Sequence, residues 1–95
     1  MNIAPDRSLL PILPRPAAYV LAGSDGKYLY KGSCRDLVER LKDHDAGRVS
    51  RTKNRRPLRL VHAECFASYS DALAREKFLK TGTGRDWLRA CLAAR

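Results

Sequence analysis

The chain has 95 residues, which is enough for one domain and too few for two. Hydrophobic residues make up 44% of it, a share that is typical of a folded globule and too high for a disordered chain. No apolar run approaches the roughly 20 residues that a membrane-spanning helix needs, and Pro11 and Pro14 interrupt the apolar stretch near the N-terminus. We therefore exclude a membrane-spanning protein and expect no secretory signal peptide.

Charge is the strongest signal in the composition. The chain carries 19 Lys and Arg against 10 Asp and Glu, which gives a net charge of +9. Such an excess favours a polyanionic partner, most often a nucleic acid; the alternative is a basic surface that is merely solvated. Much of the excess falls between positions 48 and 59, where acidic residues are absent and the basic ones are Arg48, Arg51, Lys53, Arg55, Arg56 and Arg59.

The three cysteines, Cys34, Cys65 and Cys91, are far apart in the sequence and odd in number. A disulfide framework needs paired cysteines in an exported chain, so we expect free thiols and a cytoplasmic location.

The N-terminal segment, residues 1–16, holds four of the five prolines. This composition predicts an extended arm that stays poorly ordered unless it docks. We expect residues 17–95 to form the folded domain.

A β-hairpin is predicted next, with strands over residues 17–22 and 27–32. Asp25-Gly26 between them is a strong signal for a two-residue turn. That turn fixes the register, with Tyr19 opposite Gly32, and it places Tyr19, Tyr30 and Gly32 on one face of the sheet. The two tyrosine hydroxyls can then reach a common point.

The first predicted helix covers residues 36–46 and ends at Gly47. Its apolar stripe contains Leu37, Leu41 and, unexpectedly, His44, with Arg40 along the edge of the stripe.

The rest of the chain predicts a third strand over 58–66, a helix over 71–81 with Ser70 as its N-cap, and a last helix over 85–94. Glu76 lies inside the apolar stripe of the second helix. The element order ββαβαα, with a small three-stranded antiparallel sheet flanked by helices, is an α+β fold.

Polar groups on these apolar faces mark a candidate site, because locally consistent sequences keep charge outside. Each has a structural alternative: His44 as a hydrogen-bonded interior residue, Glu76 in an ion pair with Arg75 or Lys80, and the tyrosines as core. A buried charge without a partner is costly, and together these groups suit phosphodiester hydrolysis. Arginine binds phosphate and stabilises growing charge, a carboxylate holds Mg²⁺, and a tyrosine near cations can act as a base.

Five segments resemble landmarks of the GIY-YIG nuclease family, in order and at compatible spacing. The similarity to the short single-domain members covers about residues 17–92. The landmarks are Ala18-Tyr19-Val20, Tyr30-Lys31-Gly32, the helix at 36–44, the segment at 72–77 and the link at 80–85.

The resemblance implies a small α+β domain over residues 17–95 that cleaves DNA with one divalent metal ion, Mg²⁺ or alternatively Mn²⁺. Branched or damaged DNA, as in DNA repair, is a candidate substrate, and RNA stays open. Glu76 would hold the metal, Arg40 would bind the scissile phosphate, and Tyr30, or alternatively Tyr19, would activate water. His44 corresponds to the histidine at the end of the family's first helix. Gly32 would let backbone or substrate approach closely, and the docking surface would come from Arg48, Arg51, Lys53, Arg55 and Arg56.

Two other functions are alternatives to an endonuclease. One is a binding module for nucleic acid on the same fold, with weak or no cleavage. The other is an adaptor that binds protein through the proline-rich arm.

Overall fold

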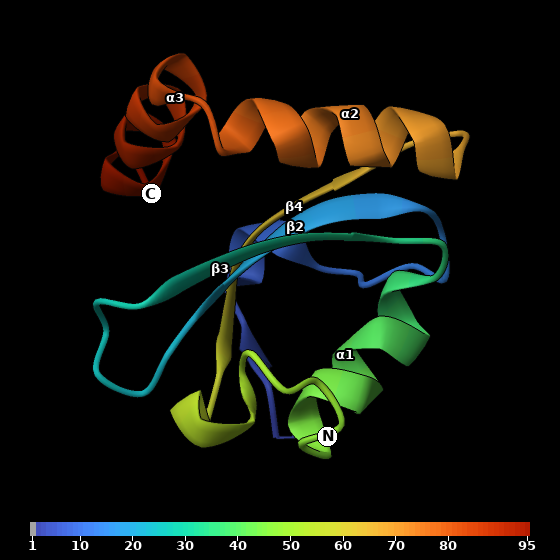
Figure 1. Cartoon of the computed structure of the whole chain (residues 1–95), viewed down its shortest axis with the longest axis vertical. Coiled ribbons are helices and arrows are strands. Elements are labelled where there is room, and N and C mark those ends of the chain that lie inside the picture. Colours follow the sequence, from blue (N-terminus) through green and yellow to red (C-terminus); the bar gives the residue numbers. More distant parts are fainter. Residues whose placement is uncertain (1) are drawn as a thin grey trace.

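Helices cover both faces of a four-stranded mixed sheet, with α1 on one face and α2 and α3 on the other (Figure 1). The structure is a computed structural model that describes residues 2–95; Met1 lies outside the described part. The fold is therefore α+β, as predicted. Its elements are β1 (Ala4–Pro5), η1 (Arg7–Leu9), β2 (Ala17–Ala22), β3 (Leu29–Cys34), α1 (Leu37–Asp45), η2 (Lys53–Arg55), β4 (Arg59–Cys65), α2 (Tyr69–Leu79) and α3 (Gly82–Ala93).

The sheet has one strand more than the sequence predicted. Its order is β1-β4-β2-β3, and the added strand β1 pairs in parallel with β4 through Ala4 and Arg59. The prediction of three antiparallel strands is wrong in this detail, because the proline-rich arm docks and Ile3 is buried in the core. A two-residue strand has no periodicity from which it could be recognised. β3 remains an edge strand.

The predicted hairpin register is confirmed. Tyr19 pairs with Gly32 and Leu21 with Tyr30. The Asp25 carboxylate accepts hydrogen bonds from the backbone N–H groups of the two residues after the turn. The second strand begins later than predicted and runs through Cys34.

Two helix boundaries differ from the prediction. The N-cap of α2 is Ser68, whose hydroxyl accepts the N–H of Asp71, and not Ser70. α3 begins at Gly82, with Thr81 as its N-cap, and not at residue 85. A Cβ at Gly84 would lie 1.8 Å from the Phe78 carbonyl oxygen, so this glycine lets the first turn of α3 pack directly on the end of α2.

Two apolar clusters lie on either side of the sheet. On the α1 face, Tyr19 and Leu21 of β2 pack with Leu37 and Leu41 of α1. The other face holds a smaller cluster of Val20, Ala22, Val61, Leu79 and Leu88. Among residues 2–95, no helix is long and apolar enough to cross a bilayer.

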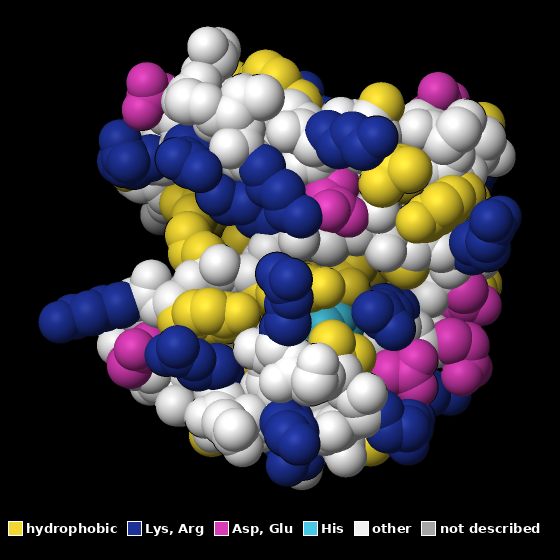
Figure 2. Space-filling view, in the orientation of Figure 1, with side chains coloured by type: hydrophobic (Ala, Val, Ile, Leu, Met, Phe, Trp, Pro, Cys, Tyr) yellow, Lys and Arg dark blue, Asp and Glu magenta, His cyan; other side chains and the backbone are white. Residues whose placement is uncertain are grey.

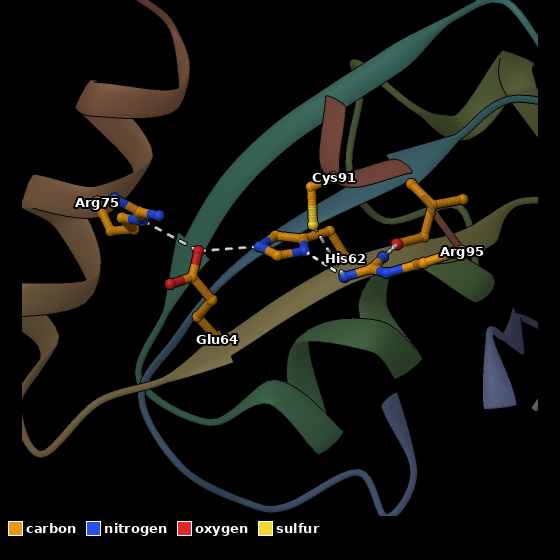
Figure 3. A network of polar contacts seen from close by, with 6 residues as sticks. His62, Glu64, Arg75, Cys91 and Arg95 are labelled. Carbon is orange, nitrogen blue, oxygen red and sulfur yellow. Dashed lines mark hydrogen bonds and ion pairs between the residues drawn. The ribbon is translucent and has the colours of Figure 1, made fainter. Parts of the chain in front are cut away.

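A polar network ties α2 and the end of the chain to β4 on the face away from α1 (Figure 3). Arg95 donates to Nδ1 of His62 at 2.7 Å, so Nε2 carries the ring proton and donates it to Glu64 at 2.9 Å. Arg75 donates to the same Glu64 oxygen at 3.0 Å and stacks on Trp87. Burial alone would raise the pKa of Glu64, but the hydrogen bonds from His62 and Arg75 outweigh it and hold that pKa below its usual value. The charged groups of this network are paired with one another, and the network holds α2 and the C-terminal residue against β4.

Candidate functional site

A buried hydrogen-bonded chain links β2, α1 and the basic loop at residues 46–58. The Tyr19 hydroxyl lies 2.7 Å from Nε2 of His44, and Nδ1 of His44 lies 2.7 Å from Oγ1 of Thr52. All three residues have no exposed surface. Each ring nitrogen of His44 therefore has one partner, as a neutral imidazole requires.

Burial determines the protonation states of His44 and Tyr19. It lowers the pKa of His44 to about 4, with the charge of Arg40 adding to the shift and Asp43 opposing it. Burial also raises the pKa of Tyr19, although the interaction with Arg40 opposes the rise. At neutral pH, His44 and Tyr19 are both uncharged.

Gly32 makes room for the two tyrosine rings. A Cβ at this position would lie 2.7 Å from the Tyr19 hydroxyl and 2.9 Å from Cε2 of Tyr30. The tyrosine rings thus occupy the space that we expected backbone or substrate to use. The Tyr30 ring also contacts His44 edge-on, with centroids 5.2 Å apart, and Tyr30 is only half-buried.

Arg40 joins this group from α1. The interaction of its guanidinium with the Tyr19 hydroxyl raises the pKa of Arg40, and Tyr30 adds to the rise while burial opposes it. Its ion pair with Asp43 is long, at 3.9 Å, and its side chain is 37% exposed. The guanidinium therefore retains donors for a ligand.

Glu76 approaches from the opposite face of the sheet. Its Oε1 accepts a hydrogen bond from Oγ of Ser33 at 2.6 Å, and its Oε2 accepts one from Nζ of Lys80 at 2.6 Å. Lys80 was one of the two ion-pair partners considered for Glu76 from the sequence, and the other, Arg75, instead binds Glu64.

The residues on the α1 face and Glu76 on the opposite face come together at the edge strand β3. Ser33, which binds Glu76, and Arg40 line the same open groove, together with Asp36 and Tyr69. Four of the five predicted catalytic residues thus lie on the α1 face, and the fifth reaches the groove's margin through Ser33.

The basic loop lies on the α1 side of the sheet (Figure 1). Its basic side chains differ in their contacts. Arg48 pairs with Asp43 at 2.9 Å. Arg56 donates to two backbone carbonyls and so holds the loop closed. Arg55 stacks over the Tyr28 ring. Arg51 and Lys53 are exposed.

Sequence reasoning missed two partners, Thr52 and Ser33. Both have short hydroxyl side chains: Thr52 lies inside the basic loop, and Ser33 lies one residue beyond the predicted strand. Neither breaks a hydrophobic pattern, so no local signal distinguished them.

The donor set fits a hard divalent cation held largely by water. Mg²⁺ commonly takes one or two protein carboxylates and keeps several waters, and Glu76 offers a carboxylate whose side chain is 16% exposed. Within residues 2–95, no group of three or more His, Cys, Asp or Glu gathers as a multidentate metal centre. The Lys80 ammonium already binds Oε2 of Glu76, so a metal ion at that oxygen would have to displace it.

Comparison with known proteins places the chain in a family. The sequence model of the GIY-YIG catalytic domain matches residues 16–89. A UPF0213 protein of Haloquadratum walsbyi is 41% identical over 66 residues, which cover 68% of this chain and 73% of that protein. One from Staphylococcus aureus is 40% identical over 72 residues, which cover 75% of this chain and 87% of that protein.

The solution NMR structure of a UPF0213 protein from Bacillus halodurans is also similar. It is 29% identical, matches 80% of this chain and 83% of that one, and has a TM-score of 0.49. The resemblance read from the motifs is confirmed by the domain match and the relatives: the chain belongs to the GIY-YIG family.

Proposed function

We propose that this chain is an endonuclease that hydrolyses DNA phosphodiester bonds with the help of Mg²⁺ or Mn²⁺. The observation that carries the proposal is the contact of a ligand-competent Arg40 with Tyr19 and Tyr30. Arg40 lines a groove, and Ser33, which also lines it, binds the Glu76 carboxylate. Family membership supports the reaction class.

Arg40 binds the scissile phosphate. Its guanidinium matches two phosphate oxygens in a fork, and it stabilises the negative charge that grows on the non-bridging oxygens during attack. Because its contact with Asp43 is long and exposed, little is lost when it turns toward substrate.

Tyr30 acts as the general base: as the phenolate it takes the proton of the attacking water and becomes the neutral phenol. Of the two tyrosines, Tyr19 is fully buried, its hydroxyl is engaged by His44, and burial raises its pKa. Those features make Tyr19 a poor base and a good positioning residue. Tyr30 is half-buried beside Arg40, so its hydroxyl can meet both water and substrate.

Glu76 holds the metal ion, with Ser33 orienting the carboxylate. When bound, the ion would polarise a phosphate oxygen and acidify water. The Lys80 ammonium would leave Oε2 of Glu76 to the ion, and a substrate phosphate would give that ammonium a new partner.

The exposed cations of the basic loop dock the DNA backbone. Arg51 and Lys53 are the best placed, because Arg55 and Arg56 also hold the loop. Neutralising all four would lower the slope of log affinity against log salt by up to about 4 units, at about 0.9 for each phosphate contact.

The test is cleavage by the full chain of duplex, nicked, flapped and forked DNA and of the matching RNA, with and without Mg²⁺ or Mn²⁺. Metal-dependent cleavage of a DNA substrate supports the proposal. Tight binding with no cleavage of any substrate would contradict it.

One observation favours a second candidate function, a module that binds nucleic acid without efficient cleavage. Both oxygens of Glu76 are already engaged at 2.6 Å, one of them by a cation. In that case Glu76 would be a structural acid that anchors Lys80.

A further inference from the structure

We propose that Lys31, Lys80, Arg85 and Arg89 form a second binding surface for DNA phosphates, on the face of the sheet opposite Arg40. DNA bound in the groove would then continue across the outer edge of β3 to α3. This inference rests on the proposed function, because it extends the contact that the groove begins.

The four cations come from three elements, and three of them surround the partly buried side chain of the fourth, Lys31. Lys31 lies on β3, Lys80 caps the end of α2, and Arg85 and Arg89 lie on α3. Burial lowers the pKa of Lys31, and the positive charges of Arg85, Lys80 and Arg89 lower it further. A cluster of this kind costs stability in the free protein, which favours a ligand of opposite charge.

Acidic partners do not balance this surface. Lys80 pairs with Glu76, and Arg89 pairs with Asp86 in a fully solvated contact whose side chains are each 77% exposed. Within residues 2–95, Lys31 and Arg85 have no ion pair. The charges of Lys31 and Arg85 are therefore uncompensated, and the neighbouring charge of Arg89 is only weakly paired.

The surface has room for a ligand. Lys31, Arg85 and Arg89 stand around a hollow whose floor is formed by leucine side chains of β3 and α3. Figure 2 shows Lys and Arg side chains over α2 and α3 in the upper half of the view and further ones in the lower half. Apolar side chains lie between the two groups.

The position of β3 connects this surface to the groove. Successive residues of a strand point to opposite faces, so Tyr30 and Gly32 lie with Tyr19 on the α1 face while Lys31 and Ser33 lie on the other. β3 is the edge of the sheet. A nucleic-acid backbone that crosses this edge can contact Arg40 on one side and Lys31 on the other.

The experiment measures DNA affinity of the full chain over a range of salt concentrations, by fluorescence anisotropy with a labelled 20-base-pair duplex. The test variant combines Lys31→Gln and Arg85→Gln and avoids Lys80, which touches Glu76. The charge-matched control combines Arg7→Gln and Arg15→Gln, two exposed arginines of the N-terminal arm. A variant with Lys31→Arg and Arg85→Lys retains both charges and controls for packing.

The proposal predicts that the test variant binds more weakly and that its salt slope is lower by about 1.8 units. Between 50 and 200 mM salt, the wild type should then lose about twelvefold more affinity than the test variant, whereas both control variants should follow the wild type. An unchanged slope in the test variant, with DNA binding by the wild type intact, would overturn this inference alone. If that variant instead loses affinity only for an oligo-aspartate peptide, the surface binds acidic protein and the inference is wrong. A wild type that binds no DNA would overturn the proposed function itself.

Discussion

The Tyr19 hydroxyl lies 2.7 Å from Nε2 of His44, where neither residue has any exposed surface. A catalytic tyrosine that contacts water directly would need access that Tyr19 lacks. The contact therefore makes Tyr19 the residue that fixes His44 and, through the ring contacts, the neighbouring Tyr30.

Tyr19→Phe should lower the free energy of unfolding by about 1–3 kcal/mol, because it leaves a buried imidazole nitrogen without a partner. Urea denaturation measures the effect. Tyr28→Phe is the matched control, since its hydroxyl binds the Arg51 carbonyl at an exposed position and its loss should cost no more than about 1 kcal/mol. Equal stability of Tyr19→Phe and the wild type would show that the hydrogen bond contributes nothing.

His44 should make the fold sensitive to mild acid. Its pKa falls from 6.5 to about 4 on folding, so the unfolded state binds the proton more tightly. Stability is then retained above pH 6.5 and lost as the pH falls toward 4, by about 2 kcal/mol between pH 7 and 4.5. His44→Gln should remove this part of the pH dependence in urea titrations. If His44→Gln retains the full wild-type slope of the free energy of unfolding against pH, other groups cause the acid sensitivity.

Arg40 should separate binding from cleavage. Arg40→Lys retains the charge but loses the planar fork, so DNA affinity should stay close to that of the wild type while kcat falls by about 10²–10³. Arg40→Ala should lower both. The measurements are equilibrium binding without metal and single-turnover cleavage with it. A fully active Arg40→Lys variant would mean that only a point charge is needed.

On the proposed function, Lys80 competes with the metal ion for Glu76. Removing the ammonium with Lys80→Met should strengthen Mn²⁺ binding about two- to fivefold, as measured by electron paramagnetic resonance of the free ion. Lys77→Met, an exposed position on the same helix, is the matched control. Unchanged Mn²⁺ affinity in Lys80→Met would place the ion away from Oε2 of Glu76.

The sequence predicted the hairpin, its register and the grouping of the two tyrosines, because strand alternation and a two-residue turn are local rules. It also identified His44 and Glu76 as polar residues on apolar helix faces. These features need only the periods of the strand and the helix.

What could not be predicted depends on contacts between distant segments. The docking of Ile3 and the parallel strand β1 arise from tertiary packing of an arm with no periodic pattern. The start of α3 depends on the close approach of Gly84 to α2, whereas the sequence predicted that this helix begins at residue 85. Thr52 and Ser33 became partners only through the fold.

The central claim is that Glu76 holds the metal ion for hydrolysis, and cleavage by Glu76→Gln tests it most directly. Gln is nearly isosteric, and the Lys80 ammonium that loses its ion pair is half exposed to solvent, so the fold should persist. DNA affinity should equal or exceed that of the wild type because a negative charge near the phosphates is removed. Glu39→Gln, an exposed position on α1, is the matched control and should cleave normally. The account predicts that Glu76→Gln binds DNA and abolishes Mg²⁺-dependent cleavage. Cleavage by Glu76→Gln at the wild-type rate would contradict it.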